Sequence, residues 1–264
     1  PITDGEKVVM RILDESNQAI TLQQLGYWGK SLAIINSAIA EPNGMILVTG
    51  PTGSGKSTSL FSVLSMLNTP EVNISTIEDP VEYKIPGVNQ TQTNAKAGMT
   101  FASGLRALLR QDPNIIMVGE IRDGETANLG VQAALTGHLV FSTLHTNNAA
   151  TCLPRLLDMG IEPFLIASTV KAVVGQRLVR RLCMNCREQY VPTQDEINEI
   201  VSLFNLRPGQ TFAHIHDLEL QAIEQKVGSD TPAGTDDTTI RTLWRAHPGG
   251  CDECGHVGFK GRVG

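Results

Sequence analysis

The sequence predicts an α/β fold with a mainly parallel sheet, together with a small element that holds four cysteines. Two observations support this prediction. Short apolar runs alternate with segments of helical spacing, which is typical of parallel strands joined by helices. Further along, two Cys-x-x-Cys pairs flank a more polar stretch. The predicted strands are residues 45–49, 74–78, 115–118 and 139–143.

Composition sets broad limits on function. The chain has 264 residues, of which 41% are hydrophobic and 18% are charged, as expected for one large or two small globular domains. Its net charge of −6 gives no electrostatic reason to bind nucleic acid, so no nucleic-acid partner is expected. No apolar run approaches the roughly 20 residues of a membrane span, and the N-terminus lacks a signal-peptide pattern. We therefore expect a cytoplasmic location.

The segment before the predicted sheet is interpreted as the end of another domain. Residues 7–13 favour a strand, a polar stretch follows, and the chain starts without Met. We expect residues 1–20 to be the tail of a preceding N-terminal domain and its linker. Residues 31–40 then predict a helix, which ends at the sequence Glu-Pro-Asn-Gly over 41–44.

Residues 50–57 read GPTGSGKS and match the phosphate-binding Walker A pattern at every required position. The glycines allow close backbone approach to phosphates, Lys56 can neutralise the β- and γ-phosphates, and Ser57 can hold magnesium. The alternative is an accidental glycine-rich turn between a strand and a helix. The predicted nucleotide-binding residues of this loop are Gly50, Pro51, Thr52, Gly53, Ser54, Gly55, Lys56, Ser57 and Thr58.

Polar side chains lie at the ends of three other predicted strands. Glu78 and Asp79 end the strand over 74–78, Glu120 follows the strand over 115–118, and His138 and His145 flank the strand over 139–143. Ligands of parallel sheets bind at the carboxyl ends of strands, where a carboxylate can orient water or bind Mg²⁺. Glu120 is the strongest candidate. Taken singly, each acid can equally be a helix cap or a solvated charge, and each histidine an ordinary core or loop residue.

Four cysteines form two tight pairs, Cys183 with Cys186 and Cys251 with Cys254. Four thiolates complete a tetrahedral zinc site without an open position for water, so the predicted role of zinc is structural. The 64 residues over 187–250 exceed the roughly 15–20 residues that separate the pairs of compact zinc ribbons. A redox pair or plain buried cysteines are therefore alternatives. Cys152 stands apart and is expected to be an inert core thiol.

Three further segments resemble the motifs of a known family. ISTIEDPVEY over 74–83 looks like its Asp box, LLRQDPNIIMVGEIRD over 108–123 like its Walker B segment, and TGHLVFSTLHTNNA over 136–149 like its His box. With the Walker A loop in the same order, they resemble the type II/type IV secretion ATPases, the motors of type II secretion, type IV pilus assembly and retraction, and DNA uptake. The likeness covers most of residues 5–186 and implies a RecA-like P-loop core.

The resemblance also implies roles for individual residues. Glu120 would be catalytic or linked to magnesium, Glu78 and Asp79 would assist water or metal, and His145 and His138 would sense the γ-phosphate. Cationic groups of the preceding domain or of a neighbouring subunit would reach the nucleotide, and Arg11 is a candidate; a solvated strand charge is the alternative. The implied cofactors are ATP and Mg²⁺, beside the structural Zn²⁺.

Partners and domains follow from the same resemblance. It implies a homo-hexamer on the cytoplasmic face of the inner membrane, in contact with a platform protein and with pilus or secretion machinery. In this family the paired cysteines are typical of assembly and secretion ATPases rather than retraction ATPases. We favour type IV pilus assembly, with type II secretion or DNA uptake as alternatives; a nucleic-acid translocase or a scaffold without hydrolysis is less favoured. The expected ATPase core spans 21–182, and the zinc-binding subdomain spans 183–264.

Overall fold

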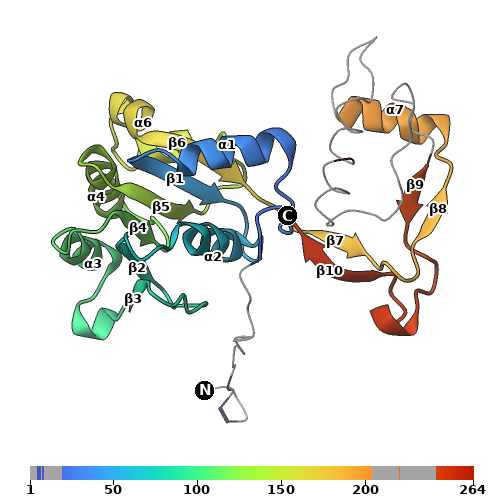
Figure 1. Cartoon of the computed structure of the whole chain (residues 1–264), viewed down its shortest axis with the longest axis horizontal. Helices are drawn as coiled ribbons and strands as arrows, with labels where there is room; N and C mark the ends of the chain where they lie inside the picture. The colour runs from blue at the N-terminus through green and yellow to red at the C-terminus, as the bar shows by residue number, and fades with distance from the viewer. Residues whose placement is uncertain (1–4, 7, 9–19, 204–219, 221–241) are drawn as a thin grey trace. The chain divides into compact units, whose positions relative to one another are not determined.

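A computed structural model describes residues 5, 6, 8, 20–203, 220 and 242–264 (Figure 1). Arg11 and nearly all of the strand predicted over 7–13 lie outside the described residues. The chain divides into two compact units. The first holds Ile34–Arg177 with the described residues up to Leu22, and the second holds Gln23–Ala33 and Leu178–Gly264.

The first unit is built on a six-stranded sheet with the strand order β3-β2-β4-β5-β1-β6. Every strand pair in this sheet is parallel, which confirms the predicted α/β class. Strands β1, β2, β4 and β5 are buried along their whole length, and burial on both faces explains the apolar runs of β1 and β4. In β2, Ser75, Thr76 and Glu78 are buried as well. The strands are β1 (Gly44–Thr49), β2 (Ile74–Glu78), β3 (Asn89–Gln92), β4 (Ile115–Val118), β5 (Leu139–Leu144) and β6 (Val170–Gly175).

Helices connect these strands. The helix predicted over 31–40 is observed as α1, which has residues in both units. Helix α3 begins where the side chain of Thr100 accepts from the backbone N–H of Ser103, whose own hydroxyl accepts from the N–H of Thr100. The helices are α1 (Gly29–Ile39), α2 (Lys56–Leu67), α3 (Phe101–Leu108), α4 (Gly124–Leu135), α5 (Cys152–Asp158) and α6 (Pro163–Thr169), with a short 3₁₀ turn, η1 (Ala95–Ala97).

The two edge strands of the sheet were not predicted. β3 has the sequence NQTQ and is partly exposed, so it carries no apolar run. β6 is likewise only partly buried and includes Lys171. An edge strand contacts the core less than a central one, and its sequence therefore carries a weaker strand signal.

The second unit contains two small antiparallel pairs. β7 (Val179–Leu182) pairs with β10 (Phe259–Val263), and β8 (Glu188–Tyr190) pairs with β9 (Leu243–Arg245). Cationic side chains cover aromatic rings: the guanidinium carbon of Arg180 lies 4.0 Å from the ring centroid of Phe259. The unit also contains α7 (Gln194–Leu203) and a 3₁₀ turn, η2 (Asp252–Cys254). Isolated two-stranded pairs are marginally stable in water, so this unit needs stabilisation beyond its own strand pairing.

None of the helices in the described ranges combines the length and the apolar character that a membrane crossing requires.

Candidate functional site

The Walker A loop leaves the carboxyl end of β1 and enters α2. Gly50, Gly53 and Gly55 have φ values of 144°, 76° and 84°, a region that residues with a Cβ rarely adopt. Gly55 is the N-cap of α2, and no side chain caps that helix end. The first backbone N–H groups of α2 are thus available to a phosphate, and the helix dipole adds positive potential there.

Lys56 points back over this loop. Its Nζ donates to the carbonyl oxygens of Gly50 (2.9 Å) and Pro51 (3.1 Å). Burial lowers the pKa of Lys56, and the negative charges of Glu120 and Glu82 offset only part of this effect. The ammonium group therefore lies within the loop that would hold the phosphates, with its charge poorly solvated. An anion bound there would relieve that cost.

Hydrogen bonds tie the Walker A loop and α2 to neighbouring strands. The hydroxyl of Thr49 donates to the carbonyl of Thr146 (2.7 Å), which joins the ends of β1 and β5. Ser59 on α2 donates to Gln176 just beyond β6 (2.8 Å). Ser54 is buried, and its hydroxyl has no hydrogen-bond partner within the described part of the chain.

Glu120 lies at the end of β4 and is 8% exposed. Its Oε2 accepts from Nε2 of His145 (2.8 Å), and its Oε1 forms an ion pair with Arg122. Burial alone raises the pKa of Glu120, but the hydrogen bonds and charges of Arg122 and His145 outweigh burial, so the net pKa is lowered. An ionised carboxylate in this position can serve as a base for water or as a magnesium-linked group.

Gly119 explains how β4 and β2 approach each other beside this carboxylate. Its N–H donates to the carbonyl of Ile77 (2.8 Å), and a Cβ at position 119 would lie 3.3 Å from both the Cα of Glu78 and that carbonyl oxygen. Most Cβ atoms in proteins have no contact this close, so the neighbouring backbone would have to shift by a few tenths of an ångström. The glycine that replaces the aspartate of an ordinary Walker B segment thus brings the ends of the two strands together.

Glu78 ends β2 and is 9% exposed. Its Oε1 accepts from the hydroxyl of Thr76 (2.6 Å) and from Nε2 of Gln90 (3.0 Å). Burial raises the pKa of Glu78, and these two hydrogen bonds offset only part of that increase. Asp79 follows as an exposed residue, and its charge contributes to the raised pKa of Arg122 after the larger contribution of Glu120.

The structure does not bring His138 to this site. His138 precedes β5, and its carbonyl accepts from the N–H of Gly44 at the start of β1, whereas the Walker A loop follows the other end of β1. Its Nδ1 donates to the carbonyl of Ala133 in the last turn of α4 (2.9 Å). His138 is therefore a turn residue at the amino end of the sheet, and the expected contact with a γ-phosphate is not supported by its position.

Gln90 was not predicted as a site residue from the sequence, and Arg122 was assigned no role in the site. Arg122 stands within the segment 108–123 and was a visible cation, but its pairing with Glu120 depends on the turn after β4. Gln90 carries no sequence signal, since a single glutamine in a polar run is ordinary.

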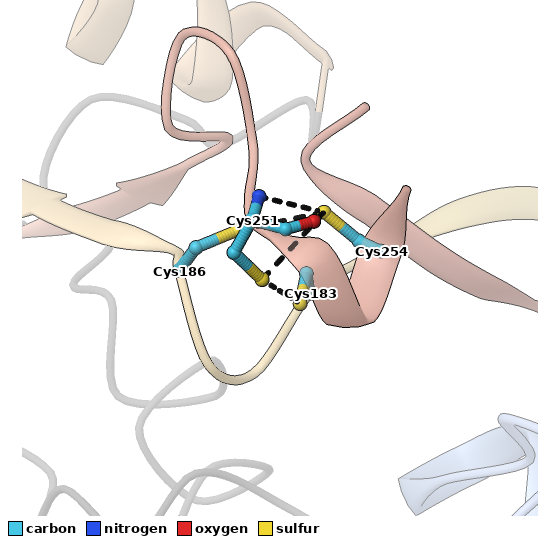
Figure 2. A group of neighbouring side chains, drawn as sticks. All are labelled: Cys183, Cys186, Cys251 and Cys254. Atoms are coloured by element: carbon cyan, nitrogen blue, oxygen red, sulfur yellow. Dashed lines mark hydrogen bonds between the residues drawn. The ribbon is translucent and has the colours of Figure 1, made fainter. Parts of the chain in front are cut away.

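The four cysteines converge in the second unit, as Figure 2 shows. Their sulfur atoms all lie within 4.8 Å of one another. Sγ–Sγ distances of 3.8 Å separate Cys183 from Cys251, Cys186 from Cys254, and Cys251 from Cys254. A tetrahedron with Zn–S bonds of about 2.3 Å has edges of roughly 3.8 Å, so the donor set fits zinc in both chemistry and spacing.

Backbone N–H groups also stabilise a thiolate in this cluster. The N–H groups of Cys251 and Gly258 each lie 3.2 Å from the sulfur of Cys254 (Figure 2 draws the first). These hydrogen bonds, that from Cys251 first, lower the pKa of Cys254 to about 6. Burial, with the neighbouring sulfurs, raises the pKa of Cys186 to about 12. Four thiolates would repel one another, and a divalent cation removes that repulsion.

Comparison with known proteins agrees with this arrangement. The sequence model of the family described as "Type II/IV secretion system protein" matches residues 1–264. A "Type II secretion system protein E" of Dickeya dadantii is 48% identical over 264 residues, which is 100% of this chain and 46% of that protein. "Type II secretion system protein HxcR" of Pseudomonas aeruginosa is 57% identical over 187 residues, or 71% of this chain and 40% of that protein. The chain thus spans slightly less than half the length of each of these two relatives.

Solved structures show the same fold. The crystal structure of "the Pilus Retraction Motor PilT and Bound ADP" matches with a TM-score of 0.56 and 28% identity, covering 84% of this chain and 69% of that one. The ATPase DotB of Yersinia pseudotuberculosis matches with a TM-score of 0.51 and 27% identity, covering 71% of this chain and 52% of that one.

Proposed function

The chain belongs to the type II/IV secretion system protein family, and from that premise we propose that it is the motor part of a type II secretion ATPase. The observation that carries the proposal is the arrangement of side chains at the carboxyl ends of the central strands. The glycine loop with Lys56 follows the carboxyl end of β1. The ionised, buried Glu120 follows the carboxyl end of β4, which is separated from β1 by β5 alone. Phosphoryl transfer needs this combination of cations that hold phosphates and a carboxylate that acts on water or metal.

We assign the residues of the loop to binding ATP. The backbone from Gly50 to Gly55 and the first turn of α2 hold the phosphates, and Lys56 leaves its loop carbonyls to pair with them. Ser57 and Thr58 supply hydroxyls in the first turn of α2, and Ser57 would hold Mg²⁺. The bound Mg²⁺ would neutralise developing charge on the phosphate oxygens.

We propose that Glu120 acts on the attacking water or on the metal. His145 and Arg122 keep its carboxylate ionised and fixed in direction. We propose that His145, which contacts Glu120, senses the γ-phosphate, and that Glu78 at the end of β2 and Asp79 after it assist the water or the metal. A trans-acting arginine from another domain or subunit can add about 10³–10⁵ in rate in motors of this kind, and Arg11 stays our candidate.

The relatives favour type II secretion over pilus assembly. Pilus assembly was the function favoured from the sequence, but the similar proteins from Dickeya, Klebsiella and Aeromonas are each named "Type II secretion system protein E". The expectation of pilus assembly is not specifically supported, and we adopt the alternative that sequence analysis also named. The four cysteines are consistent with a secretion motor of the zinc-bearing type.

We further propose the assembly in which the motor works. Residues 21–182 would form the ATPase core, 183–264 the zinc-binding subdomain, and 1–20 the link to a preceding domain. Six copies would form a ring at the cytoplasmic face of the inner membrane, in contact with a platform protein of the secretion machinery.

Phosphate release and secretion test the two levels of this proposal. The chain should release phosphate from ATP in the presence of Mg²⁺, and a variant that lacks Lys56 should not. In bacteria that lack their own type II ATPase, the full-length protein should restore secretion of an exported enzyme. ATP binding without turnover would instead indicate a nucleotide-dependent scaffold, and restored pilus assembly without secretion would support the pilus function.

A further inference from the structure

The edge strand β3 places one side chain, Gln90, against the acidic group that ends β2. The two strands pair in parallel so that Gln90 lies opposite Thr76 (β2 and β3 in Figure 1). Gln90 Nε2 donates to Oε1 of Glu78 (3.0 Å) and to the carbonyl oxygen of Tyr83 (2.8 Å). Its Oε1 accepts from the N–H of Ile85 (2.8 Å). One amide thus contacts the carboxylate and the loop that follows it.

These three contacts permit one orientation of the amide. The carboxylate of Glu78 and the carbonyl of Tyr83 can only accept, so both require the NH₂ group of Gln90. The N–H of Ile85 requires its oxygen. A rotation of the amide by half a turn would place an acceptor against two acceptors and a donor against a donor, so Gln90 is held in place and in turn fixes the position of Glu78.

The same amide connects Glu78 to the start of α2. Tyr83, whose carbonyl Gln90 holds, packs its ring against Phe61 with the ring centroids 4.9 Å apart. Its hydroxyl lies 3.3 Å from Oγ1 of Thr58, in the first turn of α2. A displacement of the loop over 79–88 would therefore shift both the Glu78 carboxylate and the start of α2.

The charges around Glu78 make this neutral donor important. Thr76 on β2 and Gln90 on β3 donate to its carboxylate, whereas the like charge of Glu82 from the following loop disfavours ionisation. The cation Arg122 at the end of β4 pairs with Glu120, and Lys56 donates to the carbonyls of its own loop. A buried carboxylate with a like charge nearby depends on its hydrogen-bond donors to stay ionised.

On the basis of the proposed ATPase function, in which Glu78 assists the attacking water or the metal, we propose that Gln90 is a positioning residue of the nucleotide site. Its amide holds the Glu78 carboxylate in its reactive direction and couples it to the start of α2.

The variant Gln90→Met tests this role, because it keeps the length of the side chain and removes its hydrogen bonds. We expect kcat to fall about tenfold or more, the scale of losing a hydrogen bond to a charged group, with KM for ATP little changed. The acid limb of the profile of kcat against pH should move to higher pH, since Glu78 then protonates more readily. Gln92→Met is the matched control: Gln92 is exposed on the same strand, accepts weakly from Val81 (3.4 Å), and should leave both quantities unchanged.

A second readout does not depend on activity. A buried acid with a raised pKa destabilises the fold increasingly as pH rises above its ordinary value of 4.5, because the unfolded state loses its proton first. The melting temperature of Gln90→Met should therefore fall further below that of the wild type as pH rises from 4.5 to 7. The same comparison can be made in a Glu78→Gln background. There, the difference in melting temperature between proteins with and without Gln90→Met should not depend on pH, and Gln90→Met should cause no further loss of kcat. If Gln90→Met does not fold, Gln90→Glu preserves the shape and should move the acid limb in the same direction.

The outcomes separate the two proposals. If the full-length assembly releases no phosphate, the proposed function fails, and the pH dependence of stability still tests the contact between Gln90 and Glu78. If the wild type is active and Gln90→Met keeps its kcat and its acid limb, Gln90 is not a positioning residue. Equal effects of Gln90→Met with and without Glu78 would assign Gln90 a purely structural role.

Discussion

At the scale of single residues, Lys56 and Glu120 should fail in different ways when substituted. Lys56→Ala removes a charge that would hold phosphates in the ground state, so ATP affinity should fall strongly. Glu120→Gln keeps the shape of the site and removes the group that acts on water or metal, so turnover should fall by about 10²–10⁴ while affinity is nearly kept. Binding of a fluorescent ATP analogue and phosphate release measure the two effects.

Two exposed residues provide matched controls for that pair. Lys96 lies on the 3₁₀ turn η1, and Glu125 pairs with Arg106 on the surface of α4 and α3. Lys96→Ala and Glu125→Gln should change neither affinity nor turnover. Equal losses of nucleotide affinity in Lys56→Ala and Glu120→Gln would contradict the assigned roles.

The ion pairs of Glu120 also predict a dependence of stability on pH. The pKa of Glu120 is lowered in the fold, so its contribution to stability is present above its ordinary value of 4.5 and is lost as pH falls through the lowered pKa. The melting temperature of the wild type should exceed that of Glu120→Gln by more at pH 6 than at pH 3. Thermal unfolding followed by circular dichroism tests this, and a gap that widens on acidification would refute it.

At the scale of the elements, the absence of a Cβ at Gly119 allows the end of β4 to lie close to the end of β2. Gly119→Asp restores the acid of an ordinary Walker B segment, but its Cβ would lie 3.3 Å from the Cα of Glu78. We expect a loss of about 1–3 kcal/mol in the free energy of unfolding, typical of overpacking, together with lower turnover. Gly119→Ala should show the smaller part of both effects. Denaturant unfolding measures the loss, and an unchanged midpoint for both variants would exclude this packing role.

The cysteine cluster should contribute to the folding of the second unit and not to that of the first. We expect one zinc ion per chain, bound by Cys183, Cys186, Cys251 and Cys254, because structural zinc contributes about 10–16 kcal/mol of apparent binding energy in small peptides. Cys183→Ser or a strong chelator should increase amide hydrogen exchange in β7 and β10 and leave β1 and β4 protected. Elemental analysis measures the metal.

Cys152 offers the control for that experiment. It is fully buried in the first unit, whereas the four cysteines belong to the second, and Cys152→Ala should retain the full zinc content. Wild-type protein without zinc, or with a disulfide inside either cysteine pair under reducing conditions, would rule out the structural metal.

At the scale of the whole molecule, hydrolysis should depend on assembly. Closed rings place each nucleotide beside a subunit boundary, and domain closure brings further cations to the γ-phosphate. Specific ATPase activity should therefore rise with protein concentration and with addition of the preceding domain that we propose. Light scattering combined with phosphate release tests this. A verified monomer as active per chain as the full-length assembly would leave a self-contained ATPase in place of a ring motor.

Local sequence was sufficient for the central elements of the fold. The four predicted strands correspond to β1, β2, β4 and β5, because a strand buried on both faces is rich in apolar or β-branched residues, which are visible in the sequence. The edge strands β3 and β6 and the short pairs of the second unit carry a weaker signal of this kind. Their pairing depends on partners distant in the sequence, and it was not predicted.

The family, the parallel α/β core and the Walker A loop could be predicted from the sequence, since each depends on consecutive residues whose spacing reflects their backbone geometry. Which distant side chains share a site depends instead on the three-dimensional packing of the strands. The order and register of the strands place Arg122 and His145 on Glu120, bring Gln90 to Glu78, and leave His138 at the other end of β5. Contacts between strands depend on which strands are neighbours, and residue spacing along one chain does not contain that order.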